Sequence, residues 1–140
     1  MNPLAENANQ YQPPKITVLM PVYNVSKFLP KCLQTLMDQT FRDFRLIAVN
    51  DGSTDNCLEI LRDFEAKYHN ITVIDQPNRG MSMARNAALA LADSKYICFV
   101  DSDDYLAPTF LQELYQAITI NDADIACCEC TYFFSPSGTK

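Results

Sequence analysis

The chain has 140 residues, of which 48% are hydrophobic, enough for one domain with a buried core. Its formal net charge of −6 disfavours binding to nucleic acid or to an anionic membrane, because both need basic patches. Three glycines and eight prolines argue against a fibrous or disordered protein. No apolar run approaches the ~18 residues of a membrane span.

The first elements follow a polar N-terminus. Residues 1–14 lack the basic start and apolar stretch of a signal peptide, so we expect a loose tail there and one domain at 15–140. Residues 16–21 are apolar and β-branched, which predicts a strand. Ser26 is a candidate N-cap for the helix that follows, and residues 45–50 predict a second strand.

The same alternation continues to residue 128. In chain order the pattern predicts a helix capped by Asp55, a strand at 71–74, a helix at 80–92, a strand at 96–100, a helix beginning at Pro108 and a fifth strand at 124–128. Apolar strands alternating with amphipathic helices are typical of an α/β fold, here a Rossmann-like, mostly parallel sheet with helices on both faces. Residues 135–140 resemble a loop, so we expect the chain to be cut short within its domain.

Six cysteines raise the question of disulfides or metal binding. Without a secretory signal we expect reduced thiols, with Cys32, Cys57 and Cys98 on the apolar faces of predicted elements. Cys127, Cys128 and Cys130 lack the fourth ligand of a zinc site, which favours packing within the fifth strand. His69 precedes a strand, where a solvent-exposed loop residue is the simpler interpretation.

Polar residues follow each of the first four predicted strands, at 21–24, 50–55, 78–86 and 101–104. In a parallel sheet these loops meet at one edge, where open α/β proteins bind ligands. Asp101 and Asp103 would share one side of an extended backbone. Clustered carboxylates require a cation, and their oxygens favour Mg²⁺ or Mn²⁺, which can hold a diphosphate. The sequence therefore indicates metal-assisted chemistry on a nucleotide.

Each of these residues also has an ordinary structural interpretation. Asp51 and Gly52 form a common turn dipeptide, and Asp55 is an ordinary N-cap. Tyr23 could pack against its loop, Arg85 could lie on a solvated helix face, and Asp104 could begin a helix. Because four separate loops are expected to meet at one edge of the sheet, we favour the functional interpretation over the ordinary structural interpretation of each residue.

Four stretches resemble the inverting family 2 glycosyltransferases, in family order and spacing over nearly the whole chain. They are Met20-Pro-Val-Tyr-Asn24, Val49-Asn-Asp-Gly-Ser-Thr-Asp55, Asn78-Arg-Gly-Met-Ser-Met-Ala-Arg-Asn86 and Phe99-Val-Asp-Ser-Asp-Asp-Tyr105. The resemblance implies a GT-A fold, of which residues 15–140 would be the nucleotide-sugar-binding part. It also implies transfer of a sugar from a nucleotide-diphosphate donor, a UDP-sugar above all, to an acceptor hydroxyl with inversion.

The resemblance also implies roles for individual residues. The first two stretches would hold the nucleoside through Pro21, Tyr23, Asp51 and Ser53, with Tyr23 on the base and Asp51 accepting the base N3–H. Arg85 would lie near the nucleotide, and Arg79 is a weaker candidate for the same role. Asp101 would contact the ribose. The metal, Mn²⁺ or Mg²⁺, would be held by Asp103 or Asp104, between which the sequence does not decide.

The resemblance places the catalytic base well beyond the acidic stretch, in an acceptor-binding half that nothing after Asp104 matches. We therefore expect the base outside this chain, which would bind donor and metal and could be inactive as a fragment. The acceptor would be a glycan, lipid-linked or protein hydroxyl in polysaccharide, glycolipid or glycoprotein assembly. We expect a cytoplasmic location, and leave open whether the full-length protein docks on a membrane.

Three other functions compete with this interpretation. A sugar-nucleotide nucleotidyltransferase would carry a glycine-rich loop after its first strand, but no glycine precedes Gly52. A phosphate-accepting receiver domain would need a Lys after its last strand, where Glu129 and Cys130 stand instead. A binding-only or degenerate nucleotide-sugar module stays open, although the intact Asp101-Ser102-Asp103 counts against it.

Overall fold

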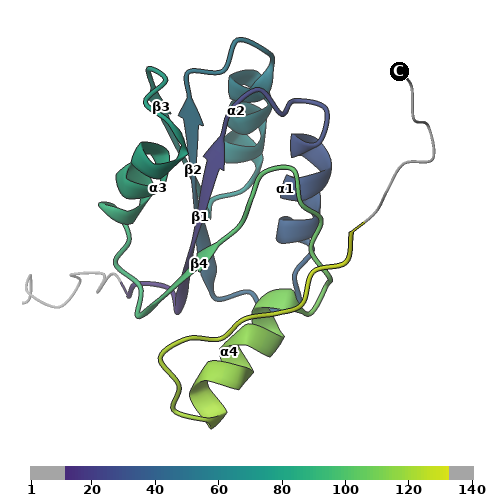
Figure 1. The fold of residues 1–140 in the computed structure, drawn as a ribbon, viewed down its shortest axis with the longest axis vertical. Coiled ribbons are helices and arrows are strands. Elements are labelled where there is room, and N and C mark those ends of the chain that lie inside the picture. Colours follow the sequence, from purple (N-terminus) through teal and green to yellow (C-terminus); the bar gives the residue numbers. More distant parts are fainter. Residues whose placement is uncertain (1–11, 133–140) are drawn as a thin grey trace, which may run out of the picture.

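The computed structural model describes residues 12–132, which form a four-stranded sheet and four helices (Figure 1). The strands are β1 (Ile16–Val22), β2 (Phe44–Asp51), β3 (Ile71–Gln76) and β4 (Tyr96–Phe99). The helices are α1 (Leu29–Met37), α2 (Cys57–Lys67), α3 (Met81–Leu89) and α4 (Phe110–Ile120). All pairings are parallel, in the order β3-β2-β1-β4, which confirms the predicted α/β class.

Helices cover both faces of the sheet, as predicted (Figure 1). Alternate residues of β1 point to opposite faces, so Val18 and Met20 join a larger core with α1 and α2, whereas Leu19 faces α3. On the α3 side, Ala84 and Ala88 pack against the sheet. Their small side chains allow a helix to approach a sheet closely, which explains why this smaller core contains few large residues.

β4 lies at the edge of the sheet and is less buried than the strands at its centre. In β1, six of seven residues are buried, whereas in β4 exposed and half-buried residues alternate. Ile97 and Phe99 are 42% and 53% exposed. β4 pairs with β1 on one side, and no strand of the described residues pairs with its other side.

The predicted fifth strand at 124–128 is wrong. Residues 125–132 form neither helix nor strand in the described part of the chain, and Ile125 is 79% exposed. Cys127, Cys128 and Cys130 are accordingly exposed instead of packed within a strand. The segment has strand propensity, but a strand also needs a paired neighbour, and propensity does not supply one.

All four helix starts differ from the prediction; α3 begins at Met81 instead of residue 80, and α4 at Phe110 instead of Pro108. α1 begins at Leu29 after a turn, so Ser26 is not its N-cap, and Pro30 occupies the first turn, where it removes no intrahelical hydrogen bond. α2 begins at Cys57, with Asn56 instead of Asp55 at the N-cap position. Among residues 12–132, no helix has both the length and the apolar character to cross a membrane.

Candidate functional site

The four predicted site loops meet at the carboxyl edge of the sheet, at the upper end in Figure 1. The parallel register sets Val22 beside Asn50 and Asp51 beside Gln76, so β1, β2 and β3 end at a common level. Leu19 of β1 pairs with Phe99, which is the last residue of β4. Each strand therefore delivers the next polar segment to the same side of the molecule.

The β1–α1 loop is tied to the β2–α2 loop by hydrogen bonds. Asn24, whose φ of 51° is left-handed, donates its backbone N–H to Ser53 Oγ over 3.1 Å. Its side-chain oxygen accepts the N–H of Thr54 at 2.8 Å. Asn tolerates this backbone region better than most residues, because its short side chain can make local hydrogen bonds. The two loops therefore form one surface around Tyr23.

Asp55 makes a second connection between the same two loops. Its carboxylate accepts the N–H of Ser26 at 2.9 Å and the N–H of Cys57 at 3.1 Å. Burial favours the protonated form, but hydrogen bonds from Cys57 and Ser26 outweigh it and lower the pKa of Asp55 to about 2. Asp55 thus accepts a hydrogen bond from the first residue of α2 and also fixes Ser26, which lies just before α1.

Asp51 ends β2 and is only 2% exposed. Its Oδ1 accepts hydrogen bonds from Gln76 Nε2 at 2.7 Å and Arg79 N at 2.9 Å, and its Oδ2 accepts Gly80 N at 2.8 Å. Burial opposes ionisation, but these donors and the Arg79 charge lower the pKa of Asp51. Asp51 therefore fixes the β3–α3 loop in this structure, and its contact with a base stays a prediction.

Gly52 follows Asp51 in a conformation that requires glycine. Its φ is 69°, and a Cβ there would lie 2.5 Å from the backbone N of Asn78. The close approach brings the β2–α2 and β3–α3 loops together. Of the other predicted nucleoside residues, Pro21 and Ser53 are partly buried, and Tyr23 is 49% exposed on the rim of the site.

The acidic loop after β4 carries three exposed carboxylates and one buried hydroxyl residue, Ser102. Arg85 of α3 reaches across to Asp101, with Nη2 to Oδ1 at 2.8 Å, and its guanidinium lies 5.9 Å from the centroid of Phe99. Partial desolvation together with the charges of Asp103 and Asp101 raises the pKa of Asp104. The structure thus brings Arg85 and the acidic loop together at the predicted edge of the sheet, and their contacts with a nucleotide stay a prediction.

Helix α1 lies beneath the acidic loop, and its residues were not predicted to belong to the site. The Cys32 thiol donates to the carbonyl of Asp101 at 3.5 Å. Burial, followed by the charges of Asp104, Asp103 and Asp101, raises the pKa of Cys32 to about 12. Thr35 and Gln39 bond to residues just after the acidic loop. Polar residues on the inner face of a predicted helix were the signal that could have identified them.

This loop could supply only some of the ligands of a divalent cation, and a bound substrate would supply others. Among residues 12–132, no group of three or more His, Cys, Asp or Glu side chains is arranged to hold a metal by itself. Mg²⁺ in nucleotide enzymes is held by one or two carboxylates together with substrate phosphates and water. The three neighbouring carboxylates of Asp101, Asp103 and Asp104 match such a site, in which a diphosphate would complete the ligand set.

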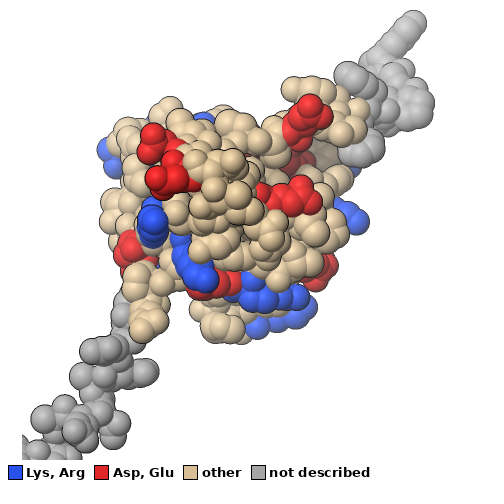
Figure 2. Space-filling view, turned by 90° about the horizontal axis from the view of Figure 1, so that it is seen from below, with Lys and Arg blue, Asp and Glu red and all other residues tan. Residues whose placement is uncertain are grey.

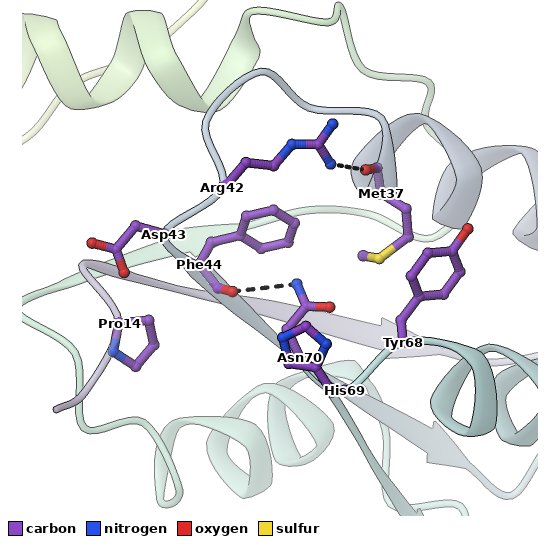
Figure 3. Close-up of a pocket in the computed structure, with 8 residues that line it drawn as sticks. All are labelled: Pro14, Met37, Arg42, Asp43, Phe44, Tyr68, His69 and Asn70. Carbon is purple, nitrogen blue, oxygen red and sulfur yellow. Dashed lines mark hydrogen bonds between the residues drawn. The ribbon is translucent and has the colours of Figure 1, made fainter. Parts of the chain in front are cut away.

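A separate cavity of about 340 Å³ lies at the opposite end of the strands (Figure 3). Two of its polar groups already serve the backbone: Arg42 Nη1 donates to Met37 O at 2.8 Å and Asn70 Nδ2 to Phe44 O at 3.3 Å. Seen from that side, basic and acidic residues are interspersed on the surface (Figure 2). The cavity is remote from the acidic loop and belongs to a different edge of the sheet.

Known proteins are similar to this chain in sequence and in fold. Residues 17–140 match the family model "Glycosyl transferase family 2". Over 112 residues, 80% of this chain, the sequence is 45% identical to glycosyltransferase GlyA of Streptococcus pneumoniae. Over 124 residues, 89% of the chain, it is 36% identical to the uncharacterized glycosyltransferase YibD of Escherichia coli.

Solved structures agree with the sequence comparison. Staphylococcus aureus TarS 1–349 in complex with UDP has a TM-score of 0.72 and 33% identity, over 79% of this chain and 33% of that one. The same TarS fragment with UDP-GlcNAc has a TM-score of 0.73, over 79% of this chain and 32% of that one. This chain spans 16% of the length of GlyA and 36% of that of YibD. The match over residues 17–140 and these relatives show that the chain belongs to glycosyltransferase family 2.

Proposed function

We propose that this chain binds the donor in a metal-dependent, inverting glycosyltransferase that moves a sugar from a UDP-sugar to an acceptor hydroxyl. The observation that carries the proposal is the meeting of Tyr23, Arg85 and the acidic loop at one edge of the sheet. TarS, which is 33% identical, has been solved with UDP and with UDP-GlcNAc, which supports a uridine nucleotide.

The nucleoside would lie over the joined β1–α1 and β2–α2 loops. Tyr23 is half exposed at their rim, so its ring can receive a base without unfolding the loop. The pairs Asn24–Ser53 and Asp55–Ser26 fix the backbone that follows Tyr23. Because these contacts exist before any ligand arrives, little ordering of the loop is needed on binding.

The diphosphate would lie between Arg85 and the acidic loop. Asp103 and Asp104 would hold the cation, and Arg85, now paired with Asp101, lies close enough to contribute its planar guanidinium to phosphate oxygens. When bound, a divalent cation stabilises the negative charge that develops on the departing diphosphate. Asp101 would orient the ribose next to that charge. The acceptor site and the catalytic base would come from a part of the protein outside this chain.

Calorimetric titration with UDP, with and without Mn²⁺, tests the proposal on the 140-residue chain. Asp103→Asn should abolish the gain in affinity that Mn²⁺ provides. Tyr23→Ala should weaken UDP about tenfold whether or not metal is present, the usual scale of a lost base–aromatic contact. Asp63→Asn, an exposed carboxylate on α2, is the matched control and should change neither value. Absence of UDP binding by the folded wild-type chain would refute the proposal.

A further inference from the structure

The segment from the acidic loop to α4 is attached to one helix face by a ladder of contacts. Cys32 and Thr35 lie three residues apart on one side of α1, and Gln39 follows two residues after the helix ends. Each bonds to a different point of the 101–111 segment. α1 and the residues just after it therefore form a continuous support beneath that segment.

Gln39 is the strongest member of this ladder. Its side chain is fully buried. Its Nε2 donates to Ala107 O at 2.7 Å and to Thr35 O at 3.1 Å, and its Oε1 accepts the N–H of Leu111 at 2.9 Å. Both ends of the amide are therefore used, one on the chain that leaves the acidic loop and one on the first turn of α4. A buried amide with this many partners is costly to replace.

Neighbouring bonds reinforce the same attachment. Thr35 Oγ1 accepts the N–H of Leu106 at 3.2 Å, and Thr40 donates its backbone N–H to the carbonyl of Pro108 at 2.9 Å. The carboxylates themselves are exposed and carry no comparable set of bonds to α1. Their position therefore depends on the backbone on either side of them. On the upstream side, Val100 donates its N–H to Leu19 of β1. On the downstream side, the bonds come from α1 and the residues just after it.

We infer that Gln39 is a positioning residue: through Ala107 and Leu111 it holds the acidic loop where a divalent cation and a diphosphate can bind together. The inference rests on the proposed function, because it assigns the metal half of that site to this support. Gln39 itself touches neither ligand. Its loss should therefore weaken the contribution of the metal and leave the contacts of the nucleoside unchanged.

Gln39→Leu tests this inference by removing the amide at similar volume. Without metal, its UDP affinity should stay within about twofold of wild type, whereas the Mn²⁺-dependent gain should fall about fivefold or more, the scale of one lost hydrogen bond. Amide hydrogen exchange should accelerate at Leu106 and Leu111 and stay unchanged in β1 and β2. Thr35→Val, which removes the acceptor for Leu106 while keeping the shape, should act in the same direction and decides the question if Gln39→Leu does not fold.

Gln34→Leu is the matched control, since this glutamine of α1 bonds to Asp38 at 2.9 Å instead of to the loop. An unchanged Mn²⁺-dependent gain in folded Gln39→Leu and Thr35→Val would overturn the inference. So would an equal loss of metal-free and metal-dependent binding, which marks a merely structural role. If wild type binds no UDP, or binds it without a metal-dependent gain, the proposed function fails first. If wild type shows that gain and folded Gln39→Leu and Thr35→Val keep it, this inference alone fails.

Discussion

Replacing Asp55 by Asn should destabilise the protein by about 2 kcal/mol at neutral pH. The lowering of the Asp55 pKa from 3.8 to about 2 measures how much the folded state favours the carboxylate. At about 1.4 kcal/mol per pKa unit, and allowing for the partial exposure of the side chain, this corresponds to about 2 kcal/mol. The carboxylate uses one oxygen for the Ser26 N–H and the other for the Cys57 N–H. An amide has only one oxygen, so at least one of these bonds is lost in the variant.

The pH dependence of the difference identifies its origin. Because the pKa of Asp55 is lower in the folded than in the unfolded chain, its contribution is complete above about pH 4 and is lost as the pH falls towards 2. The free energy of unfolding of wild type should exceed that of Asp55→Asn by about 2 kcal/mol at pH 6 and by about 1 kcal/mol at pH 3.

Urea denaturation followed by circular dichroism measures both values, and it suits a chain without tryptophan. Asp63→Asn, an exposed carboxylate on the same α2 helix, is the control and should stay close to wild type at each pH. A difference below about 0.5 kcal/mol at pH 6, or one that does not shrink on acidification, would refute the assignment of Asp55 as the link between the two loops.

Three further predictions follow from local geometry. Gly52→Ala should lower the free energy of unfolding by about 2 kcal/mol or more, because its φ is 69° and its Cβ would meet Asn78, whereas Gly80→Ala, with open space around it, should cost about 1 kcal/mol; equal losses in urea denaturation would contradict this. Leu33→Ala, in the centre of the larger core, should cost about 2–5 kcal/mol in the same assay, and a loss below that range would mean the core can collapse around the gap. Iodoacetamide at pH 8 should label the exposed cysteines quickly and the buried Cys32 slowly, as read by mass spectrometry; fast labelling of Cys32 would show that α1 is not held against the acidic loop. The exposed cysteines are Cys127, Cys128 and Cys130.

The main elements were predictable because their apolar periodicity is local. Four strands and four helices lie where the alternation of patterns places them, with starts that differ by a few residues. The fifth strand failed for a different reason. Residues 124–128 have strand composition, but a strand forms through hydrogen bonds to a neighbour, and the described residues supply none. The strand propensity of the segment predicted a strand, but without a neighbouring strand to pair with it does not form one.

The positions of the site loops were also predictable, since parallel strands bring their carboxyl ends to one edge. The bonds that fix those loops were not. Gln39 bonds to a residue 72 positions away and Asn24 to one 30 positions away, so neither contact leaves a local pattern. Asp55 shows the same limit, because its interpretation as an ordinary N-cap describes only its bond to Cys57 and omits the bond to Ser26.

These contacts divide the site into two halves that share α1. Just before the helix, Asp55 joins Ser26 to the nucleoside loops, and two residues after its end Gln39 holds the chain that leaves the acidic loop. A helix of nine residues is short and stiff, so its tilt sets the spacing between the two halves. Arg85–Asp101 links α3 to the same acidic loop from the opposite face of the sheet. A change that tilts α1 should therefore alter nucleoside and metal binding together, whereas a change at Arg85 should alter the diphosphate half alone.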